Sequence, residues 1–307
     1  MPGIAVLALF AAAIPNAVVQ QPVTNMFSKP SQDADVVSQA IYGANVAVLE
    51  QKDGWAHIRT ADEYTGWAPL QALVVGPVYG ANGKAAQVQS LFAHIYREPD
   101  VTKHAPLLTV PWEVRLEAAD GPNATSNRRI CVRLGDGRTG YIQSGDVTLH
   151  LARISTADML ALSRKFLGLP YTWGGTSSYG YDCSGFTQML ERQRGVIMRR
   201  DADLQAAWNG VVPVARPDIE PGDLLYFGSS GKHITHTGMY LGDGKFINAT
   251  THLTPMVRID DLDDRRASQK AFRTAEGTAG RPEREPKPVA GCARRAELCP
   301  DRRRGPR

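Results

Sequence analysis

An internal repeat in the first half of the chain limits its fold more than any other feature. Six residue positions recur 74 residues apart, as Ile58-Arg59-x-x-Asp62-x-x-Thr65-Gly66-Trp67 and Val132-Arg133-x-x-Asp136-x-x-Thr139-Gly140-Tyr141. A short strand ending in Leu-Glu precedes each copy, at Leu49-Glu50 and at Leu116-Glu117. Chance similarity is the alternative, but six matches in ten positions favour a true duplication. Short β-branched and aromatic strands separated by turn residues predict two small all-β units, residues 18–78 and 86–150. Units of this size bury little core alone, so we expect each to pack against a neighbour.

The pattern changes in residues 151–275. Ser155 or Thr156 can cap a helix that runs to Leu167 and closes at Gly168. A second helix is expected from about Cys183 to Gly195, followed by strands at 223–227, 237–241 and 245–249. Helices grouped before antiparallel strands predict an α+β domain.

Both termini differ from the rest in composition. Twelve apolar residues run from Ile4 to Pro15, too few for a bilayer span of ~20 residues. We interpret residues 1–17 as a signal peptide cut after Ala17, which predicts an exported protein, periplasmic or secreted, with no stable membrane span. The alternatives are a buried first strand or a misassigned start, with a cytoplasmic protein. Residues 276–307 are rich in Pro, Gly, Arg and Glu and are expected to form a disordered basic tail.

The net charge of +4 is a property of that tail. Lys and Arg number 35 and Asp and Glu 31; nine of the basic and four of the acidic residues fall within residues 281–307. The remaining chain holds 26 basic and 27 acidic groups. No nucleic-acid partner is therefore predicted from charge.

Four cysteines are too few for a disulfide scaffold. Cys292 and Cys299 could pair in the tail, and Cys131 reads as a small buried hydrophobe in a strand. Cys183 lies where a glycine-rich loop enters an amphipathic helix. A thiol at a helix N-terminus faces the positive end of the macrodipole, which favours a thiolate nucleophile. Inert core packing is the alternative for a lone helix cysteine.

His236 and Asn248 are candidate partners of this thiol. A three-residue loop at 242–244 would place His236 opposite Thr250, with Asn248 diagonal to it on the same face. A two-residue turn would put Asn248 on the wrong face. His233 is the competing histidine and is expected to be solvated. Cysteine, histidine and a polar orienting residue in this order form a papain-like arrangement.

Ordered sequence blocks carry a family resemblance. They are Tyr171-x-Trp173-Gly174-Gly175, Asp182-Cys183-Ser184-Gly185, Arg200-Asp201, Pro221-Gly222-Asp223-Leu224, Thr235-His236-x-Gly238 and Phe246-Ile247-x-Ala249. Residues 165–250, which hold these blocks, resemble the NlpC-type cell-wall cysteine peptidases. In the first half of the chain, Gly54-Trp55-x-x-Ile58-Arg59 with Gly66-Trp67 resembles a bacterial SH3-like barrel. The expected fold is an α+β papain-like catalytic domain preceded by two small all-β SH3-like barrels.

The resemblance implies a set of roles. Cys183 matches the nucleophile and His236 the base, and Asn248 stands at the third position, where the family often has histidine. Tyr171 matches a tyrosine that helps to polarise the scissile carbonyl, and the backbone N–H of Cys183 is the expected oxyanion donor.

The implied activity is hydrolysis of the γ-D-glutamyl–diamino-acid bond in peptidoglycan stem peptides, with no cofactor or metal. Similar enzymes with two leading SH3-like modules require a free N-terminal L-Ala. Tyr64, Asp182, Ser184 and Asp203 are the candidates for binding its ammonium group. An exposed loop position is the alternative for Tyr64, and helix capping is the alternative for Asp201 and Asp203.

Other functions remain open at this point. The chain could be a catalytically weak cell-wall-binding protein that acts through its SH3-like units, or it could use the same site for acyl transfer. The sequence does not separate diaminopimelate from lysine, or intact sacculi from released peptides. The acids at 260, 261, 263 and 264 are read as a solvated loop.

Overall fold

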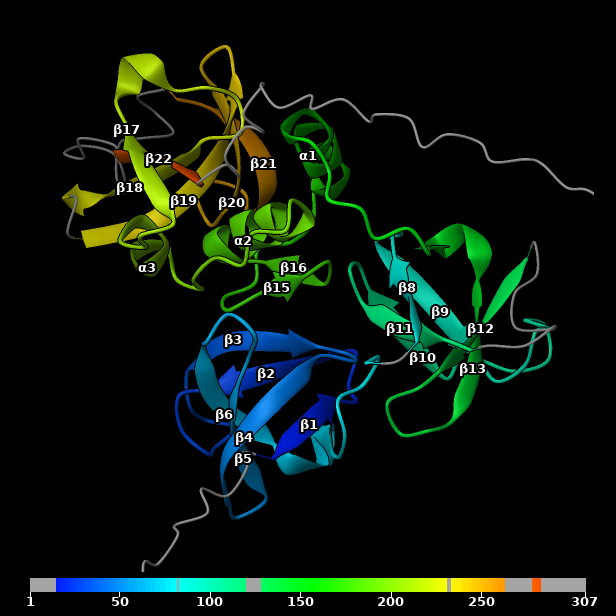
Figure 1. The fold of residues 1–307 in the computed structure, drawn as a ribbon. Helices are drawn as coiled ribbons and strands as arrows, with labels where there is room; N and C mark the ends of the chain where they lie inside the picture. The colour runs from blue at the N-terminus through cyan, green and yellow to red at the C-terminus, as the bar shows by residue number, and fades with distance from the viewer. Residues whose placement is uncertain (1–14, 82, 120–127, 231–232, 263–277, 283–307) are drawn as a thin grey trace, which may run out of the picture.

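The computed structural model describes residues 15–81, 83–119, 128–230, 233–262 and 278–282. Two all-β units precede a third unit of helices and a six-stranded sheet (Figure 1). This architecture confirms the fold class expected from the sequence.

The first unit is a seven-stranded antiparallel sheet with the strand order β3-β2-β6-β5-β4-β1-β7. Its elements are β1 (Asn16–Val19), β2 (Val23–Phe27), β3 (Val36–Ile41), β4 (Asn45–Lys52), β5 (Trp55–Arg59), β6 (Thr65–Pro69), the 3-10 turn η1 (Leu70–Ala72) and β7 (Leu73–Val75). Met26, Val46 and Ile58 are among the side chains that fill its core.

The first strand corrects the predicted boundary at residue 18. Asn16–Val19 forms β1, which pairs with β4 on one side and β7 on the other. Ala17 is fully buried there. Cleavage after Ala17 would split this strand, so the barrel begins at Asn16; the rest of the predicted signal peptide, residues 1–14, lies outside the described residues.

The second unit repeats the first strand for strand. Its sheet order is β10-β9-β13-β12-β11-β8-β14. Its elements are β8 (Lys84–Val88), β9 (Phe92–Tyr96), β10 (Leu108–Pro111), β11 (Arg115–Ala118), β12 (Arg129–Arg133), β13 (Thr139–Gln143), η2 (Ser144–Asp146) and β14 (Val147–Thr148).

The repeated residues form the same hairpin in both units. Ile58 faces Gly66 across β5 and β6, and Val132 faces Gly140 across β12 and β13. A Cβ on either glycine would meet a core side chain at 2.9 Å or less, so both positions need glycine. The loop between the strands also repeats, because Asp62 and Asp136 each accept a hydrogen bond from the backbone N–H two residues on.

The Leu-Glu pairs are not equivalent in space. Val48 pairs with Ile58 and Ala118 with Val132. Leu116 is buried, whereas Leu49 follows a register shift in β4 and is exposed. The bulge in the first unit therefore breaks the apparent correspondence.

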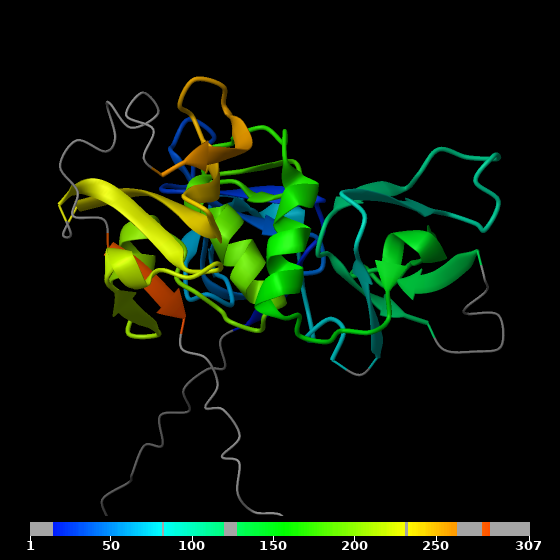
Figure 2. The same cartoon turned by 90° about the horizontal axis from the view of Figure 1, so that it is seen from above.

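The catalytic unit packs helices on one face of a sheet, as Figure 2 shows from above. Its elements are α1 (Thr156–Ser163), η3 (Arg164–Phe166), β15 (Thr176–Ser177), β16 (Gly180–Tyr181), α2 (Cys183–Gln193), α3 (Ala202–Ala206), β17 (Val211–Val214), η4 (Arg216–Asp218), β18 (Leu224–Ser230), β19 (His233–Gly242), β20 (Lys245–Thr250), β21 (Met256–Asp261) and β22 (Thr278–Pro282). Ser155 caps α1, as expected, but the α-helix ends at Ser163 and the 3-10 turn η3 continues the predicted helix to Phe166. Gly168 and Gly195 take positive φ after the two segments. Phe186, Met189 and Leu190 of α2 pack in one core with Met239 and Ile247 of the sheet.

Strand β22 corrects the prediction of a disordered tail from residue 276. Residues 278–282 pair with both β17 and β18 and so belong to the sheet. The tail residues 283–307 lie outside the described part of the chain. Among the described residues, no helix has the length and apolar character needed to cross a membrane.

Both barrels pack against the catalytic unit, as their small size requires. Glu113 of the second barrel accepts two hydrogen bonds from Arg192 of α2, at 2.6 and 2.8 Å. In the first barrel, the Gln39 side chain accepts a bond from the Thr176 N–H of β15. Strand β3 therefore lies beside the loop that leads into α2 (Figure 1).

Candidate active site

Cys183 is the first residue of α2. Asp182 caps this helix, since its Oδ1 accepts a hydrogen bond of 2.7 Å from the Gly185 N–H. The Cys183 side chain is buried, and the backbone N–H groups of Thr237 and Ser184 act on its pKa. The sulfur therefore lies near β19, at the residue that follows His236 in the strand.

The structure confirms that His236 and Asn248 meet. His236 Nε2 lies 2.9 Å from Asn248 Oδ1, and Asn248 is 1% exposed. The imidazole stacks on Phe227, with ring centroids 5.8 Å apart. With Nε2 facing the amide, Nδ1 is the ring nitrogen that remains for the thiol proton.

The β19–β20 hairpin has the expected register, but its turn differs from the three-residue loop that was predicted. Asp243 and Gly244 form a two-residue turn, both with positive φ. A bulge at Leu241 adds one residue to β19. Met239 then faces Ile247, the pairing that a three-residue loop would give, so the bulge places Asn248 on the same face as His236.

Burial decides the charge state of the pair. It raises the pKa of the Cys183 thiol to about 12, and the charge of Asp182 acts in the same direction. Burial also lowers the pKa of His236, whereas the hydrogen bond that its Nε2–H donates to Asn248 Oδ1 and the charge of Asp260 act to raise it. The position of the thiol at the helix N-terminus acts in the opposite direction and favours thiolate. The lowered pKa of His236 favours the neutral ring, which can accept the thiol proton as a general base.

Tyr171 lies near the thiol. Its pKa is raised, first by burial and then by the charges of Cys183 and Asp182. The Tyr171 backbone bridges to Tyr181, two residues before Cys183. The phenol therefore stays protonated and can donate a hydrogen bond near the reacting atoms.

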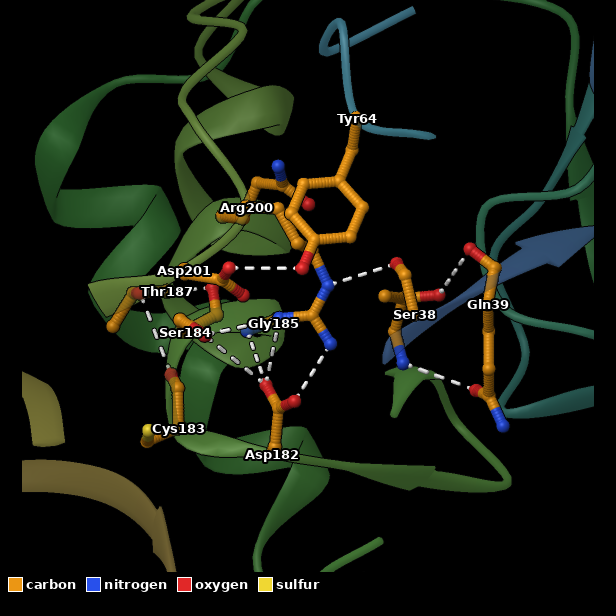
Figure 3. A network of polar contacts seen from close by, with 12 residues as sticks. Ser38, Gln39, Tyr64, Asp182, Cys183, Ser184, Gly185, Thr187, Arg200 and Asp201 are labelled. Atoms are coloured by element: carbon orange, nitrogen blue, oxygen red, sulfur yellow. Dashed lines mark hydrogen bonds and ion pairs between the residues drawn. The ribbon is translucent and has the colours of Figure 1, made fainter. Parts of the chain in front are cut away.

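Asp182 and Ser184 are held by a buried arginine (Figure 3). Arg200, 1% exposed, donates to Asp182 Oδ1 at 3.1 Å and Oδ2 at 2.6 Å, and to Ser184 Oγ at 3.0 Å. Its Nε donates to Ser38 Oγ in β3. The charge of Asp182 is thus already paired with a cation inside the protein.

Tyr64 reaches the catalytic unit from the loop between β5 and β6 (Figure 3). Its hydroxyl donates a hydrogen bond of 2.9 Å to Asp201 Oδ2, across 137 residues of sequence. Asp203, by contrast, is exposed and accepts a bond from the N–H of Leu204. Of the two acids, Asp201 is the one that meets the first barrel, and its side chain makes no capping bond to α3.

Three residues at the site were not predicted from the sequence: Arg200, Ser38 and Asp260. Arg200 and Ser38 lie 162 residues apart, and the only sequence signal for either was the Arg200-Asp201 block. Asp260, read as part of a solvated loop, lies in β21 and accepts a 3.0 Å hydrogen bond from Asn248 Nδ2. Cross-strand pairing of β20 and β21, which the sequence did not predict, brings the two residues together.

Two further expectations have outcomes. His233 is exposed, as expected. Cys131 is a free cysteine and is only partly buried. Its neighbours Ile130 and Val132 take the inward-facing positions of β12. The prediction of a buried Cys131 is therefore wrong: the alternation of the strand turns its side chain outward.

Within the described residues, no group of three or more His, Cys, Asp or Glu could hold a metal ion.

A thiol at a helix N-terminus, with a strand histidine hydrogen-bonded to an asparagine, is the pattern of a papain-like cysteine peptidase domain, which here follows two all-β units. Residues 168–275 match the NlpC/P60 family, and residues 26–73 match the bacterial dipeptidyl-peptidase Sh3 domain. Residues 168–275 of this chain are therefore an NlpC/P60 domain.

Two relatives align with most of this chain. A gamma-D-glutamyl-L-lysine dipeptidyl-peptidase of Bacillus cereus is 31% identical over 229 residues, which are 69% of this chain and 66% of the relative. Dipeptidyl-peptidase 6 of Lysinibacillus sphaericus is 25% identical over 76% of this chain and 88% of its own. The chain thus spans just under two thirds of the first relative.

One solved structure shows the same fold along most of the chain. It is an NlpC/P60 family protein from Bacillus cereus, with a TM-score of 0.72 and 22% identity over 86% of this chain and 98% of that one. The arrangement of two all-β units before the catalytic unit is therefore found in a second protein.

Proposed function

We propose that this protein hydrolyses the bond between γ-D-glutamate and the diamino acid in peptidoglycan stem peptides. The observation that carries the proposal is the 2.9 Å contact between His236 and Asn248, together with Cys183 as first residue of the helix that packs on the strand of His236. The names of the relatives, which include gamma-D-glutamyl-L-lysine dipeptidyl-peptidase, support the substrate class.

The residues support a two-step acyl transfer. His236 Nδ1 takes the thiol proton while the sulfur attacks the scissile carbonyl carbon, and the same proton then passes to the leaving amine. As first residue of α2, Cys183 has a backbone N–H without an intrahelical acceptor, so this group can donate to the developing oxyanion. Tyr171 can donate a second hydrogen bond. Water then attacks the thioester and releases the acyl product, with His236 as base.

Specificity for a free N-terminal L-Ala is part of the proposal. Tyr64 and Asp201 form a contact between the first barrel and the start of α3, and a carboxylate near a phenol suits an ammonium group. We assign this role to Asp201 in place of Asp203, because the Asp203 side chain is exposed and accepts a hydrogen bond from the N–H of its own neighbour Leu204. Roles for Asp182 and Ser184 in ammonium binding stay predictions, because Arg200 already binds both.

The test compares defined peptides. The protein is incubated with L-Ala-γ-D-Glu-diaminopimelate, with its lysine analogue, with the N-acetylated forms and with whole sacculi, and the products are identified by mass. Release of L-Ala-γ-D-Glu from the free-amine peptides alone is the expected result. Equal cleavage of the acetylated peptides would remove Tyr64 and Asp201 from their role.

Matched cysteine variants assign the activity. Cys183→Ser should abolish dipeptide release, whereas Cys131→Ser, which changes a free cysteine of the second barrel, should leave it intact. Activity that persists in Cys183→Ser would contradict the mechanism. Binding to sacculi without release of any product by the wild-type protein would instead favour a wall-binding function.

Export is proposed on the apolar run Ile4–Pro15 alone. Mass measurement of the mature protein after expression in a bacterial host tests it. Removal of a segment ending before Asn16 would support export and keep β1 whole. An unprocessed protein in the cytoplasm would contradict it.

A further inference from the structure

The side of Asn248 away from His236 carries a second set of contacts. Asn248 Nδ2 lies 3.0 Å from Asp260 Oδ2 and 3.4 Å from the Arg258 carbonyl oxygen. Asn248 is 1% exposed, and the Asp260 side chain is 10% exposed. These are short contacts in a nearly dry part of the sheet, so they count strongly in holding the amide.

The chemistry of these partners fixes which way the amide points. A carboxylate and a backbone carbonyl only accept hydrogen bonds. If the amide were turned over, its oxygen would face both acceptors, and its NH₂ group would face His236. The observed orientation instead presents Oδ1 to His236 Nε2 at 2.9 Å. An oxygen there requires a proton on Nε2, which leaves the lone pair of the neutral ring on Nδ1.

Asp260 is itself held in place. Arg258, on the same strand, donates to Asp260 Oδ1 through Nε at 2.8 Å and also through Nη2. Oδ2 is left for Asn248. The neighbouring acid, Asp261, points elsewhere and pairs with Lys245 at 2.7 Å on the exposed side of the strand.

We propose that Asp260 is a positioning residue of the catalytic site, which acts through Asn248 to fix the Nε2–H tautomer of His236 and to supply the negative charge that asparagine lacks. The charged and polar groups that act on the pKa of the ring are Asn248 from β20, Asp260 from β21 and Asp182, the cap of α2. The negative charge of Asp260 favours the imidazolium that forms when the thiol loses its proton. Asn248, at the third position, thus orients His236, and the Asp260 carboxylate, which is hydrogen-bonded to Asn248, supplies the negative charge.

This inference rests on the proposed thiol chemistry, but its test does not need the proposed substrate. The rate of Cys183 alkylation by iodoacetamide is measured between pH 5 and 9 in a chain whose other three cysteines are serine. The variants are Asp260→Asn, Asp260→Glu and the matched control Asp261→Asn. A failure of peptide hydrolysis would contradict the proposed function and leave the alkylation result readable.

We expect Asp260→Asn to lower the alkylation rate at pH 7 by roughly 10- to 100-fold, by analogy with the loss of the hydrogen-bond partners that orient metal-binding histidines. The midpoint of the pH profile should move to lower pH, and Asp260→Glu should recover part of the rate. Asp261→Asn should match the parent protein. A rate for Asp260→Asn within twofold of the parent, with the same midpoint, would overturn the proposal.

A double-mutant comparison separates positioning from mere stability. If Asp260 acts through Asn248, then Asp260→Asn should change alkylation little once Asn248 is alanine. Effects that multiply in Asn248→Ala/Asp260→Asn would overturn the proposal.

A measurement on the unmutated side chains covers the case in which the Asp260 variants do not fold. Ring-nitrogen NMR shifts of His236 near pH 8 should show the proton on Nε2. A proton on Nδ1 would overturn the assignment.

Discussion

The guanidinium group of Arg200 binds both carboxylate oxygens of Asp182, at 3.1 and 2.6 Å, while its Nε donates to Ser38 of the first barrel. One buried side chain therefore joins the SH3-like unit to the cap of the helix that carries Cys183. The orientation of the proposed nucleophile depends on a contact between domains.

Loss of this arginine should destabilise the protein. Arg200→Ala leaves the Asp182 carboxylate buried without its cation, which typically costs about 3–5 kcal/mol. Arg200→Lys keeps the charge but loses the two parallel bonds, so we expect a smaller loss. Urea unfolding measures both. As a control, Arg138→Ala removes an exposed partner of Asp136 and should cost about 0–1 kcal/mol; equal losses at the two positions would contradict the role of Arg200.

The glycine after Cys183-Ser184 has a steric reason. A Cβ at Gly185 would lie 2.1 Å from the Gly175 carbonyl oxygen. Because that contact is to backbone, Gly185→Ala must shift the first turn of α2 or the loop before it, and overpacking of this kind costs about 1–3 kcal/mol. We expect lower thermal stability and a large loss of Cys183 alkylation. Gly76→Ala, where a Cβ meets nothing within 4 Å, is the matched control; a normal alkylation rate in Gly185→Ala would contradict this explanation.

The hydroxyl of Tyr64 is expected to affect substrate binding more than chemistry. Tyr64→Phe removes the donor to Asp201 and leaves the phenyl ring in place. Loss of one hydrogen bond to a charged group is worth about 1.5–3 kcal/mol, so KM for the free-amine peptide should rise by roughly 10-fold or more, with kcat little changed. Tyr141→Phe changes a tyrosine of the second barrel and should have no effect. Steady-state kinetics distinguish the two, and an unchanged KM in Tyr64→Phe would rule out the contact as part of the binding site.

The depressed pKa of His236 predicts a pH dependence of stability. The unfolded chain binds the histidine proton near pH 6.5, whereas the folded protein binds it only at lower pH. Below pH 6.5 the unfolded state therefore holds more protons, and stability falls as the pH drops, by at most about 1.4 kcal/mol per pH unit. Urea unfolding at pH 7.5, 6.0 and 5.0 measures this loss.

His236→Gln isolates the contribution of this side chain. The variant should lose less stability than the parent between pH 7.5 and 5.0, whereas His233→Gln, at an exposed position, should follow the parent. The same slope in His236→Gln and in the parent would show that another group governs the acid range.

Local signals were enough for much of the fold. The repeat with its paired glycines and Asx turns predicted two alike barrels, because each repeated residue acts within its own hairpin. Capping by Ser155 and the glycine after each helix marked α1 and α2 for the same reason. Cys183 and His236 stood out as chemistry within recognisable blocks.

Features that depend on pairing between distant parts of the chain were not predicted from the sequence. The composition around β22 resembles a disordered tail, and the composition around β1 resembles a signal peptide. Both segments form strands because neighbouring strands of the sheets pair with them. Cys131 looked apolar enough for the core, but the pleat of β12 decided otherwise.

The sequence by itself determined the class of fold, the cysteine and the histidine, because short-range periodicity and motif spacing encode them. Tertiary structure alone decided which charged residues lie at the candidate site. Asp201 meets Tyr64 across 137 residues, Arg200 meets Ser38 across 162, and Asp260 reaches Asn248 through the pairing of β20 and β21. A carboxylate has the same local signal in a solvated loop as in a buried network; only the partners that the fold brings within 3 Å distinguish the two.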